Sequence, residues 1–247
     1  MTLHLVELPL SLKALHVWAG VRRLGSGFDE GVALHHLLGE TFGPAMLQPF
    51  RLMVAPRAEN GSLYAYAAED AAALRQKAQL SLTPDLAAVV DPARLRSIPR
   101  PAATWVAGQR IGFDLRIRPV ARLASALAGQ DETGAEVRLR KGAEVDAFLA
   151  TVLRGATTTR EDVYRDWLAA RLGMAADLEM ATTRMVSFQR SRIQRDGRRI
   201  EGPNAVFHGT VVIADPAAFA ALLAKGVGRH RSYGYGMLLL RPAQRVM

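Results

Sequence analysis

The sequence predicts an α+β protein of two tandem ferredoxin-like (βαββαβ) domains, which we place at residues 1–100 and 101–247. Segments with strand-type and helix-type periodicity follow one another as strand, helix, two strands, helix, strand, and this order occurs twice. A proline-bearing link, Ile98-Pro99-Arg100-Pro101, separates the two halves. Of the 247 residues, 49% are hydrophobic and 22% are charged, so the chain can bury a substantial core.

The first half shows most of these elements. We expect, in order, a strand at 3–8, helices at 11–21 and 29–42, strands at 50–55 and 63–67, and a helix at 69–80. Asp29 is expected to cap the second helix, because its side chain can accept from the free backbone N–H groups there. Asn60-Gly61 is a turn-forming pair and predicts a hairpin between the two strands.

The second half repeats the order. We expect a strand at 110–120, a hairpin or mobile loop at 129–141, helices at 143–154 and 160–173, strands at 178–192 and 205–214, a helix at 216–225 and a strand at 234–241. The first of these alternates in polarity and predicts a half-buried strand with Arg116 and Arg118 on its polar face. Asp215-Pro216 is expected to open the last helix and Gly226 to close it.

Composition excludes several classes of protein. Cysteine is absent, so disulfide scaffolds, thiolate metal sites and cysteine nucleophiles are excluded. No apolar run approaches the roughly 18 to 20 residues that span a bilayer, and the start of the sequence lacks the features of a signal peptide. We therefore expect a cytoplasmic protein that has no membrane contact.

The charge of the chain points to an anionic partner. The formal net charge is +9, and 28 of the 32 basic residues are arginine, which favours bidentate contacts to phosphate and guanine. Residues 184–199 hold six arginines against one acid, Asp196; the arginines are Arg184, Arg190, Arg192, Arg195, Arg198 and Arg199. A solvated loop is one interpretation, and a nucleic-acid contact is the other, since such arginines repel one another unless an anion joins them.

One histidine stands out as a candidate for proton transfer. No pair among the six histidines has the spacing of a metal site, so we expect no metal. On the predicted helix at 29–42, His35 lies at the edge of the apolar face near Phe42, whereas His36 lies nearly opposite, beside Glu40. A histidine held at such a boundary is either structural or an acid or base for attack of a ribose 2′-hydroxyl on the adjacent phosphate.

The segment from Gly226 to Gly236 (GVGRHRSYGYG) is the other unusual element. It follows a helix and precedes a strand, the reverse of a dinucleotide fingerprint, and has no phosphate-loop lysine, so we expect no nucleotide cofactor or other small-molecule cofactor. A glycine-rich turn that only packs between sheets is one interpretation. The other is an RNA contact made by a closely approaching backbone with charged and stacking side chains; its candidates are Gly228, Arg229, His230, Arg231 and Tyr233.

These motifs resemble those of a known family. GVGRHRSYGYGMLLLRP is similar to the glycine-rich signature of CRISPR repeat-associated proteins, and above all of the CasE-type endoribonucleases of type I-E Cascade. LHHLLGETFG followed by PFRLMV resembles that family's N-terminal helix and next strand. Weaker similarities continue in the same order through FDLRIRPV, the helix from Tyr164 to Leu172, and FHGTVVIADPAAFAALLAKGVG.

The resemblance implies a function as well as a fold. It implies metal-independent cleavage of CRISPR precursor RNA at the base of a repeat stem-loop, with 5′-hydroxyl and 2′,3′-cyclic phosphate ends. The protein would keep hold of the product and assemble with other Cascade subunits. The family's catalytic histidine falls on His35, and its basic hairpin falls on the stretch from Arg184 to Arg199.

One departure from the family keeps an alternative open. The tyrosine that some members carry three residues before the histidine is here Val32, so its role is dispensable or is supplied elsewhere, by Tyr233 or an arginine. The alternative function is a non-catalytic RNA-binding subunit that caps a guide RNA in an effector complex. A module that binds DNA or a protein partner through the same arginines is a third interpretation.

Overall fold

The computed structural model describes residues 2–24, 28–195 and 198–243, with the side chains of 192–195 and 198–200 left outside the description. The first half contains β1 (Leu3–Ser11), α1 (Leu12–Val21), α2 (Glu30–Phe42), β2 (Phe50–Met53), β3 (Asn60–Ala67), α3 (Ala71–Ser81), α4 (Pro84–Val89) and β4 (Arg96–Arg100). Its antiparallel sheet has the strand order β2-β3-β1-β4. This is the order of a ferredoxin-like sheet, with the first and third strands in the centre.

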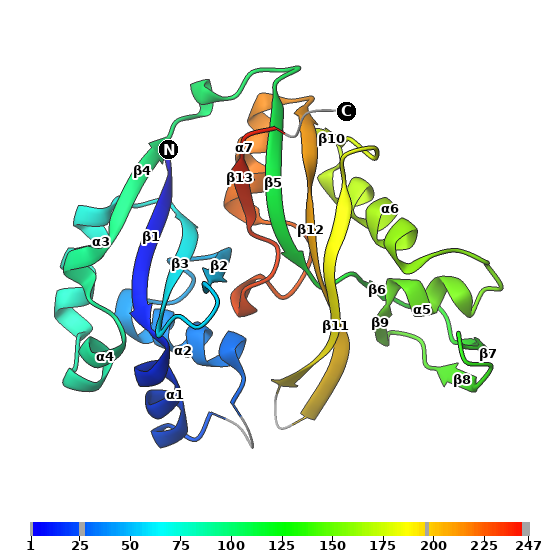
Figure 1. The fold of residues 1–247 in the computed structure, drawn as a ribbon, viewed down its shortest axis with the longest axis horizontal. Helices are drawn as coiled ribbons and strands as arrows, with labels where there is room; N and C mark the ends of the chain where they lie inside the picture. The colour runs from blue at the N-terminus through cyan, green and yellow to red at the C-terminus, as the bar shows by residue number, and fades with distance from the viewer. Residues whose placement is uncertain (1, 25–27, 196–197, 244–247) are drawn as a thin grey trace.

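Alternation along β1 explains how this sheet is covered. Val6, Leu8 and Leu10 are buried, and they share one core with Leu34 and Leu37 of α2, because alternate residues of a strand point to the same face. The helices α1 to α4 all contribute to that core, together with residues of β2 and β3. The opposite face of the sheet is turned toward the second half of the molecule (Figure 1).

The second half contains β5 (Arg110–Ile117), β6 (Val120–Arg122), β7 (Leu127–Gln130), β8 (Glu136–Leu139), β9 (Glu144–Asp146), α5 (Ala147–Val152), α6 (Arg160–Leu172), β10 (Ala176–Leu178), β11 (Arg184–Arg195), β12 (Arg198–Ile213), α7 (Pro216–Lys225), a 3₁₀ turn η3 (Arg231–Tyr233) and β13 (Leu238–Arg241). Its main sheet has the order β10-β12-β5-β13, and β11 also pairs with β12. Both sheets thus follow one topology, which confirms the predicted α+β fold of two ferredoxin-like halves.

The strand β12 is long enough to pair with three other strands. Its later residues pair with β10 and β5, and its earlier residues pair with β11, from Arg184↔His208 to Arg195↔Arg198. As a result, β11 and the first part of β12 project beyond the rest of their sheet, toward the end of the molecule where α1 and α2 lie (Figure 1). We call this projecting pair of strands the basic hairpin.

Polar contacts join the two halves. The Tyr66 hydroxyl of β3 donates to the backbone carbonyl of Leu238 in β13 at 3.1 Å. Arg51 of β2 lies 3.5 Å from buried Asp114 of β5, and Arg241 and His208 contact the same carboxylate at 2.6 and 3.0 Å. Because both sheets contribute to these contacts, the face of each sheet away from its helices forms the seam between the halves.

Most helix boundaries agree with the sequence predictions, and so do the caps. Asp29 accepts from the backbone N–H of Val32 at 3.1 Å at the start of α2, and Asp215 accepts from two backbone N–H groups at the start of α7. Gly226 follows α7 with φ +75°. Residues 127–139 form the β7–β8 hairpin, which was one of the two alternatives expected there.

Two predictions about strands were wrong in detail. The β2–β3 hairpin exists, but Asn60 and Gly61 begin β3, and the chain reverses at Ala55–Ala58 instead. Residues 110–120 are also not half-buried, because β5 lies between β12 and β13, with helices on one face and the first half on the other. Arg118 follows this strand and is only 1% exposed.

Two predicted segments are divided differently. The helix expected at 143–154 is reduced to α5, because Glu144–Asp146 form β9 and pair with β6. The strand expected at 178–192 is two strands, β10 and β11, separated by a turn at 179–183. Among the described residues, no helix combines the length and the apolar character needed to cross a membrane. The expected cytoplasmic location stays a prediction.

Candidate functional site

His35 is positioned by the amphipathic helix α2. Leu34, Leu37 and Leu38 are buried in the first core, so the helix is fixed against its sheet. His35 is half-buried at the border of this face, and His36 is exposed. Both placements confirm the prediction from the helical wheel, and they leave His35 as the histidine held by packing yet accessible from one side.

Burial favours the neutral form of His35. Burial lowers the pKa of its imidazole, and the nearby charge of His36 lowers this pKa further. Its Nδ1 is buried and has no hydrogen-bond partner among the described residues, so a second ring proton would be poorly solvated there. The imidazole is therefore mostly neutral at neutral pH, and Nε2 is the atom that can exchange a proton with a ligand.

The titration of His35 tests this electrostatic account. By NMR, we expect its midpoint to lie below the ordinary value of about 6.5 for histidine. His36→Gln should raise the midpoint, because the substitution removes one of the two causes that lower this pKa. His16→Gln, which changes an exposed histidine on α1, is the control and should leave the midpoint unchanged. A lower midpoint in His36→Gln would contradict the account.

The segment 226–236, which we call the glycine-rich segment, packs directly on α2. A Cβ atom on Gly31 would lie 2.7 Å from the carbonyl oxygen of Tyr233, so the two backbones approach as closely as glycine allows. One helical turn along α2, the ring centroid of His35 lies 5.3 Å from that of Tyr233. The structure thus brings together two of the residues selected from the sequence.

The other predicted residues of this segment have distinct placements. Gly228 has φ +77°, and a Cβ there would lie 2.6 Å from the ring of Trp167, so this glycine is needed for packing. Arg229 is exposed, with Nε 3.2 Å from Glu144, and Arg231 donates to the backbone carbonyl of Lys225 at 2.5 Å. His230 adopts a left-handed conformation (φ +61°) and contacts Glu144 at 2.6 Å. The segment therefore combines a glycine packed tightly on Trp167 with three basic side chains, those of Arg229, His230 and Arg231, which we call its basic edge.

Two cavities adjoin at this place. One, of about 210 Å³, is lined by His35, His36 and the turn after α2, including Ala45 and Gln48. The other, of about 440 Å³, is lined by Ala45 and Gln48 together with the basic edge of the glycine-rich segment. Both cavities are lined by Ala45 and Gln48, so each of them borders the turn after α2.

The basic hairpin contributes exposed arginines, although they do not gather at one point. Twelve residues of β11 separate Arg184 from Arg195 by roughly 35 Å, given the rise of a strand. Arg184 lies at the root, where it donates to the backbone carbonyls of Met180 and Thr183. The Arg190 side chain is 57% exposed and lies 3.8 Å from Glu132.

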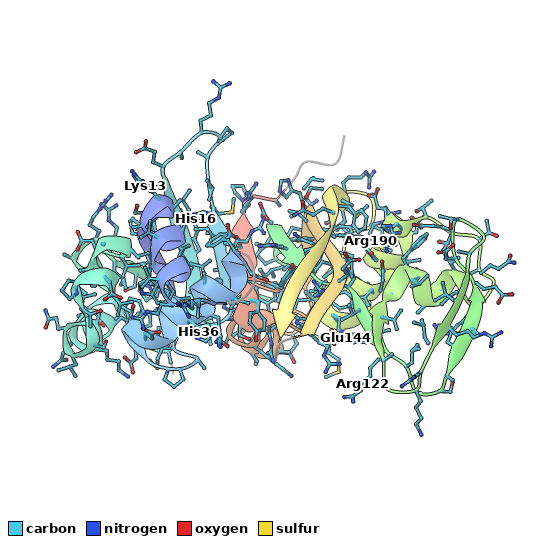
Figure 2. All side chains as sticks on the ribbon, turned by 90° about the horizontal axis from the view of Figure 1, so that it is seen from below. Lys13, His16, His36, Arg122, Glu144 and Arg190 are labelled. Atoms are coloured by element: carbon cyan, nitrogen blue, oxygen red, sulfur yellow. The ribbon has the colours of Figure 1, made fainter. Side chains whose placement is uncertain are left out.

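Four more arginines were predicted to bind here. Only their backbone positions are described, with Arg192 and Arg195 on β11 and Arg198 and Arg199 on β12, and their side chains lie outside the described part of the structure. Seen from below, the basic hairpin lies between the helix that carries His36 and the strands that carry Glu144 (Figure 2).

Contacts of Ser191, on β11, connect the basic hairpin to the site. Ser191 Oγ lies 3.1 Å from the Tyr235 hydroxyl, and the buried Arg118 donates to Ser191 Oγ at 3.0 Å. Arg116 lies over the Tyr235 ring at 4.6 Å and reaches Glu30 of α2 at 3.7 Å. Hairpin, glycine-rich segment and α2 thus form one connected site.

Sequence reasoning missed several of these residues. Glu144, which contacts both Arg229 and His230, lies 86 positions from His230 in a segment predicted to be helical. Arg116, Tyr235 and Ser191 were not selected either. No local pattern marks these residues, because each acquires its partner only when distant segments meet. Among the described residues, no group of three histidine, aspartate or glutamate side chains is arranged to hold a metal ion.

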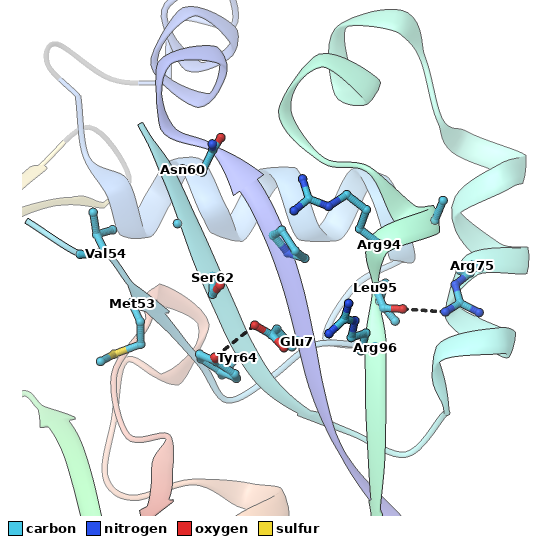
Figure 3. A pocket seen from close by; sticks show the side chains of 14 residues that line it. Glu7, Met53, Val54, Asn60, Ser62, Tyr64, Arg75, Arg94, Leu95 and Arg96 are labelled. Atoms are coloured by element: carbon cyan, nitrogen blue, oxygen red, sulfur yellow. Dashed lines mark hydrogen bonds between the residues drawn. The ribbon is translucent and has the colours of Figure 1, made fainter. Parts of the chain in front are cut away.

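A larger cavity lies elsewhere and includes none of the predicted site residues. It has about 810 Å³ and opens on the face of the first sheet opposite α2 (Figure 3). Arg75, Arg94 and Arg96 border it, and the Tyr64 hydroxyl donates to Glu7 at 3.2 Å on its floor. Arg75 donates to the Leu95 carbonyl at 2.7 Å, so one of these cations already has a partner.

Solved structures share this fold along almost the whole chain. Thermus thermophilus Cse3 bound to an RNA representing a pre-cleavage complex is 20% identical, with 98% of this chain and 100% of that chain covered and a TM-score of 0.61. CRISPR-associated protein Cas6e from Escherichia coli str. K-12 is 18% identical, with 97% and 99% covered and a TM-score of 0.60. A chain of a CRISPR RNA-guided surveillance complex, pre-nicking, is 20% identical, with 97% and 99% covered and a TM-score of 0.50.

Sequence comparison gives the family. No curated protein matches this chain. The family model described as CRISPR associated protein, however, matches residues 3–242, almost the entire sequence. The chain therefore belongs to the CRISPR associated protein family, as its sequence motifs predicted.

Proposed function

We propose that this protein is an endoribonuclease that cuts CRISPR precursor RNA at the base of the repeat stem-loop and stays bound to the product. The observation that carries the proposal is the half-buried, neutral His35 beside Tyr233, where two adjoining cavities border a basic edge. Structures of the same fold include a Cse3 bound to an RNA that represents a pre-cleavage complex. We further propose that the chain works as a subunit of a Cascade-type complex, since a surveillance-complex chain also shares its fold.

In the proposed reaction, His35 acts as the base. Its neutral Nε2 takes the proton of a ribose 2′-hydroxyl, and the 2′ oxygen attacks the neighbouring phosphorus. The bond from phosphorus to the 5′ oxygen then breaks, which gives a 2′,3′-cyclic phosphate and a 5′-hydroxyl. Exposed cations such as Arg229 and Arg190 lie where they can stabilise the negative charge of the RNA.

Single-turnover cleavage of the cognate repeat RNA in EDTA tests the reaction. We expect one cut at the stem base, with the ends described above, and no cut when the nucleotide before the scissile phosphate carries 2′-deoxyribose. Cleavage of that deoxy substrate would contradict 2′-hydroxyl attack. Loss of cleavage in EDTA would contradict metal independence.

A second candidate function is a non-catalytic RNA-binding subunit that caps a guide RNA. Val32 favours it, because one turn before His35 the helix offers a half-buried aliphatic side chain and no hydroxyl to the substrate. Tight binding of the hairpin RNA without any cut, under single-turnover conditions, would support this function and exclude the first.

Arg190 provides a test of the RNA-binding surface. Arg190→Ala should weaken binding of the hairpin RNA and reduce the slope of log affinity against log salt by about 1, because one phosphate contact is lost. Arg138→Ala removes another exposed arginine, on β8, and serves as the matched control. An unchanged slope for Arg190→Ala would remove that residue from the interface. Competition by duplex DNA of the same sequence tests the choice of RNA over DNA.

A further inference from the structure

A second histidine shares an aromatic neighbour with His35. The ring centroid of His230 lies 6.4 Å from that of Tyr233, which itself lies 5.3 Å from His35. His230 precedes the 3₁₀ turn η3, and its backbone carbonyl accepts from the N–H of Tyr233 at 2.9 Å. Its side chain is 7% exposed, so the imidazole is held by its surroundings.

Glu144 of β9 fixes the orientation of this imidazole. His230 Nε2 lies 2.6 Å from one carboxylate oxygen of Glu144, and Arg229 Nε lies 3.2 Å from the other. The hydrogen bond from His230 holds the pKa of Glu144 below its ordinary value, as do the charges of His230, Arg229 and Arg118, although burial opposes them. Because the ionised carboxylate occupies Nε2, Nδ1 is the ring nitrogen left for a ligand.

The cavities place the two imidazoles along one path. His230 lines the cavity of about 440 Å³, together with Arg229, Arg231 and Ser232. This cavity meets that of His35 at Gln48. An RNA backbone that occupied both cavities would have one of the two imidazoles beside it in each.

We propose that His230, oriented by Glu144, is a second catalytic residue, the acid that protonates the departing 5′ oxygen. This inference rests on the proposed endoribonuclease function and completes its proton balance. His35 Nε2 takes the 2′-hydroxyl proton while the bond from the 2′ oxygen to phosphorus forms. The bond from phosphorus to the 5′ oxygen breaks, its electron pair stays on that oxygen, and the oxygen takes the proton from His230 Nδ1. Exchange with water then restores the charge on both imidazoles.

A substrate with sulfur in place of the departing 5′ oxygen tests this role. A thiolate leaves without a proton, so a variant that lacks only the acid should cut this RNA at the wild-type rate. On ordinary RNA, His230→Gln should be slower by about 10²- to 10⁴-fold, the usual contribution of one proton-transfer group. Glu144→Gln should show a smaller loss on ordinary RNA and the same rescue by sulfur, whereas His35→Ala should be slow on both substrates.

His208→Gln is the matched control, because His208 also contacts a carboxylate, Asp114, at 3.0 Å, but it belongs to the seam between the halves and lines neither of the two cavities. It should cut both substrates at the wild-type rate. Melting temperature and RNA affinity, measured for each variant, show whether it is folded and binds substrate.

Three results would overturn the proposal. They are a wild-type rate of His230→Gln on ordinary RNA, an equal loss on both substrates, and rescue of His35→Ala in place of His230→Gln. In each of these cases the wild-type protein still cuts, and the proposed function stands. If the wild-type protein leaves both substrates intact, the proposed function fails and this inference fails with it.

Discussion

His35→Ala is expected to slow single-turnover cleavage of the repeat RNA by about 10²- to 10⁴-fold and to leave RNA affinity unchanged. The reason is that the variant loses the neutral imidazole that takes the 2′-hydroxyl proton, while the exposed arginines that attract the RNA remain. His35 is also only half-buried, so its removal leaves the buried leucines of α2 in place. Rates on labelled RNA with protein in excess separate this chemical step from product release.

The neighbouring His36 offers the control. It lies on the same helix with its side chain exposed, so His36→Ala should bind and cut like the wild type at neutral pH. Equal losses in both variants would indicate a general effect on α2 and would remove the special role of His35. Normal cleavage by His35→Ala would exclude it as the base.

Local physics explains what the sequence could predict. The helix α2 shows its period in Leu34, Leu37 and Leu38, and its start in the Asp29 cap, so both the helix and the boundary position of His35 follow from neighbouring residues. The order of elements repeats in the two halves, which made the fold class predictable before any contact was known. The division of the chain at residue 100 stays a prediction.

The errors arise where tertiary contacts override local patterns. Arg116 and Arg118 alternate with apolar residues and predict a solvated face, yet β5 is covered on both sides. Arg116 in this strand contacts Asn204, and Arg118 just after it contacts Ser191. Asn60-Gly61 has the composition of a turn, but Gly61 pairs with Leu10 within the sheet. Alternating polar and apolar residues predict which face of a strand is buried only when the other face of that strand is exposed to solvent.

The site shows the same division between local and long-range information. His35 and the glycine-rich segment were selectable as motifs, since each is unusual in its own stretch of sequence. Their contact was not predictable, because it depends on the close approach of Gly31 to Tyr233, some 200 positions away in the chain. Glu144 is the clearest case, since nothing near it distinguishes it from an acid on a solvated helix.

The close approach at Gly31 leads to a second large expected effect. Gly31→Ala should lower the rate of RNA cleavage by about 10²-fold, because a displacement near 1 Å of a catalytic group costs that much. The new methyl group would lie 2.7 Å from the carbonyl oxygen of Tyr233 and 3.2 Å from its Cβ, and the backbone carbonyl cannot rotate away. The helix and the turn must therefore separate, which moves His35 from the glycine-rich segment.

The matched control is Gly20→Ala in α1, where an added Cβ has nothing within 4 Å. In a helix, alanine is more stable than glycine by roughly 0.5 to 1 kcal/mol. Both variants, Gly31→Ala and Gly20→Ala, therefore gain helix stability of the same kind. Gly20→Ala should then melt no lower than the wild type and cut RNA at the wild-type rate. If Gly31→Ala also cut at the wild-type rate, the contact between α2 and the 3₁₀ turn would be irrelevant to catalysis. A loss confined to Gly31→Ala, with RNA affinity preserved, would instead show that the distance between His35 and Tyr233 sets the rate.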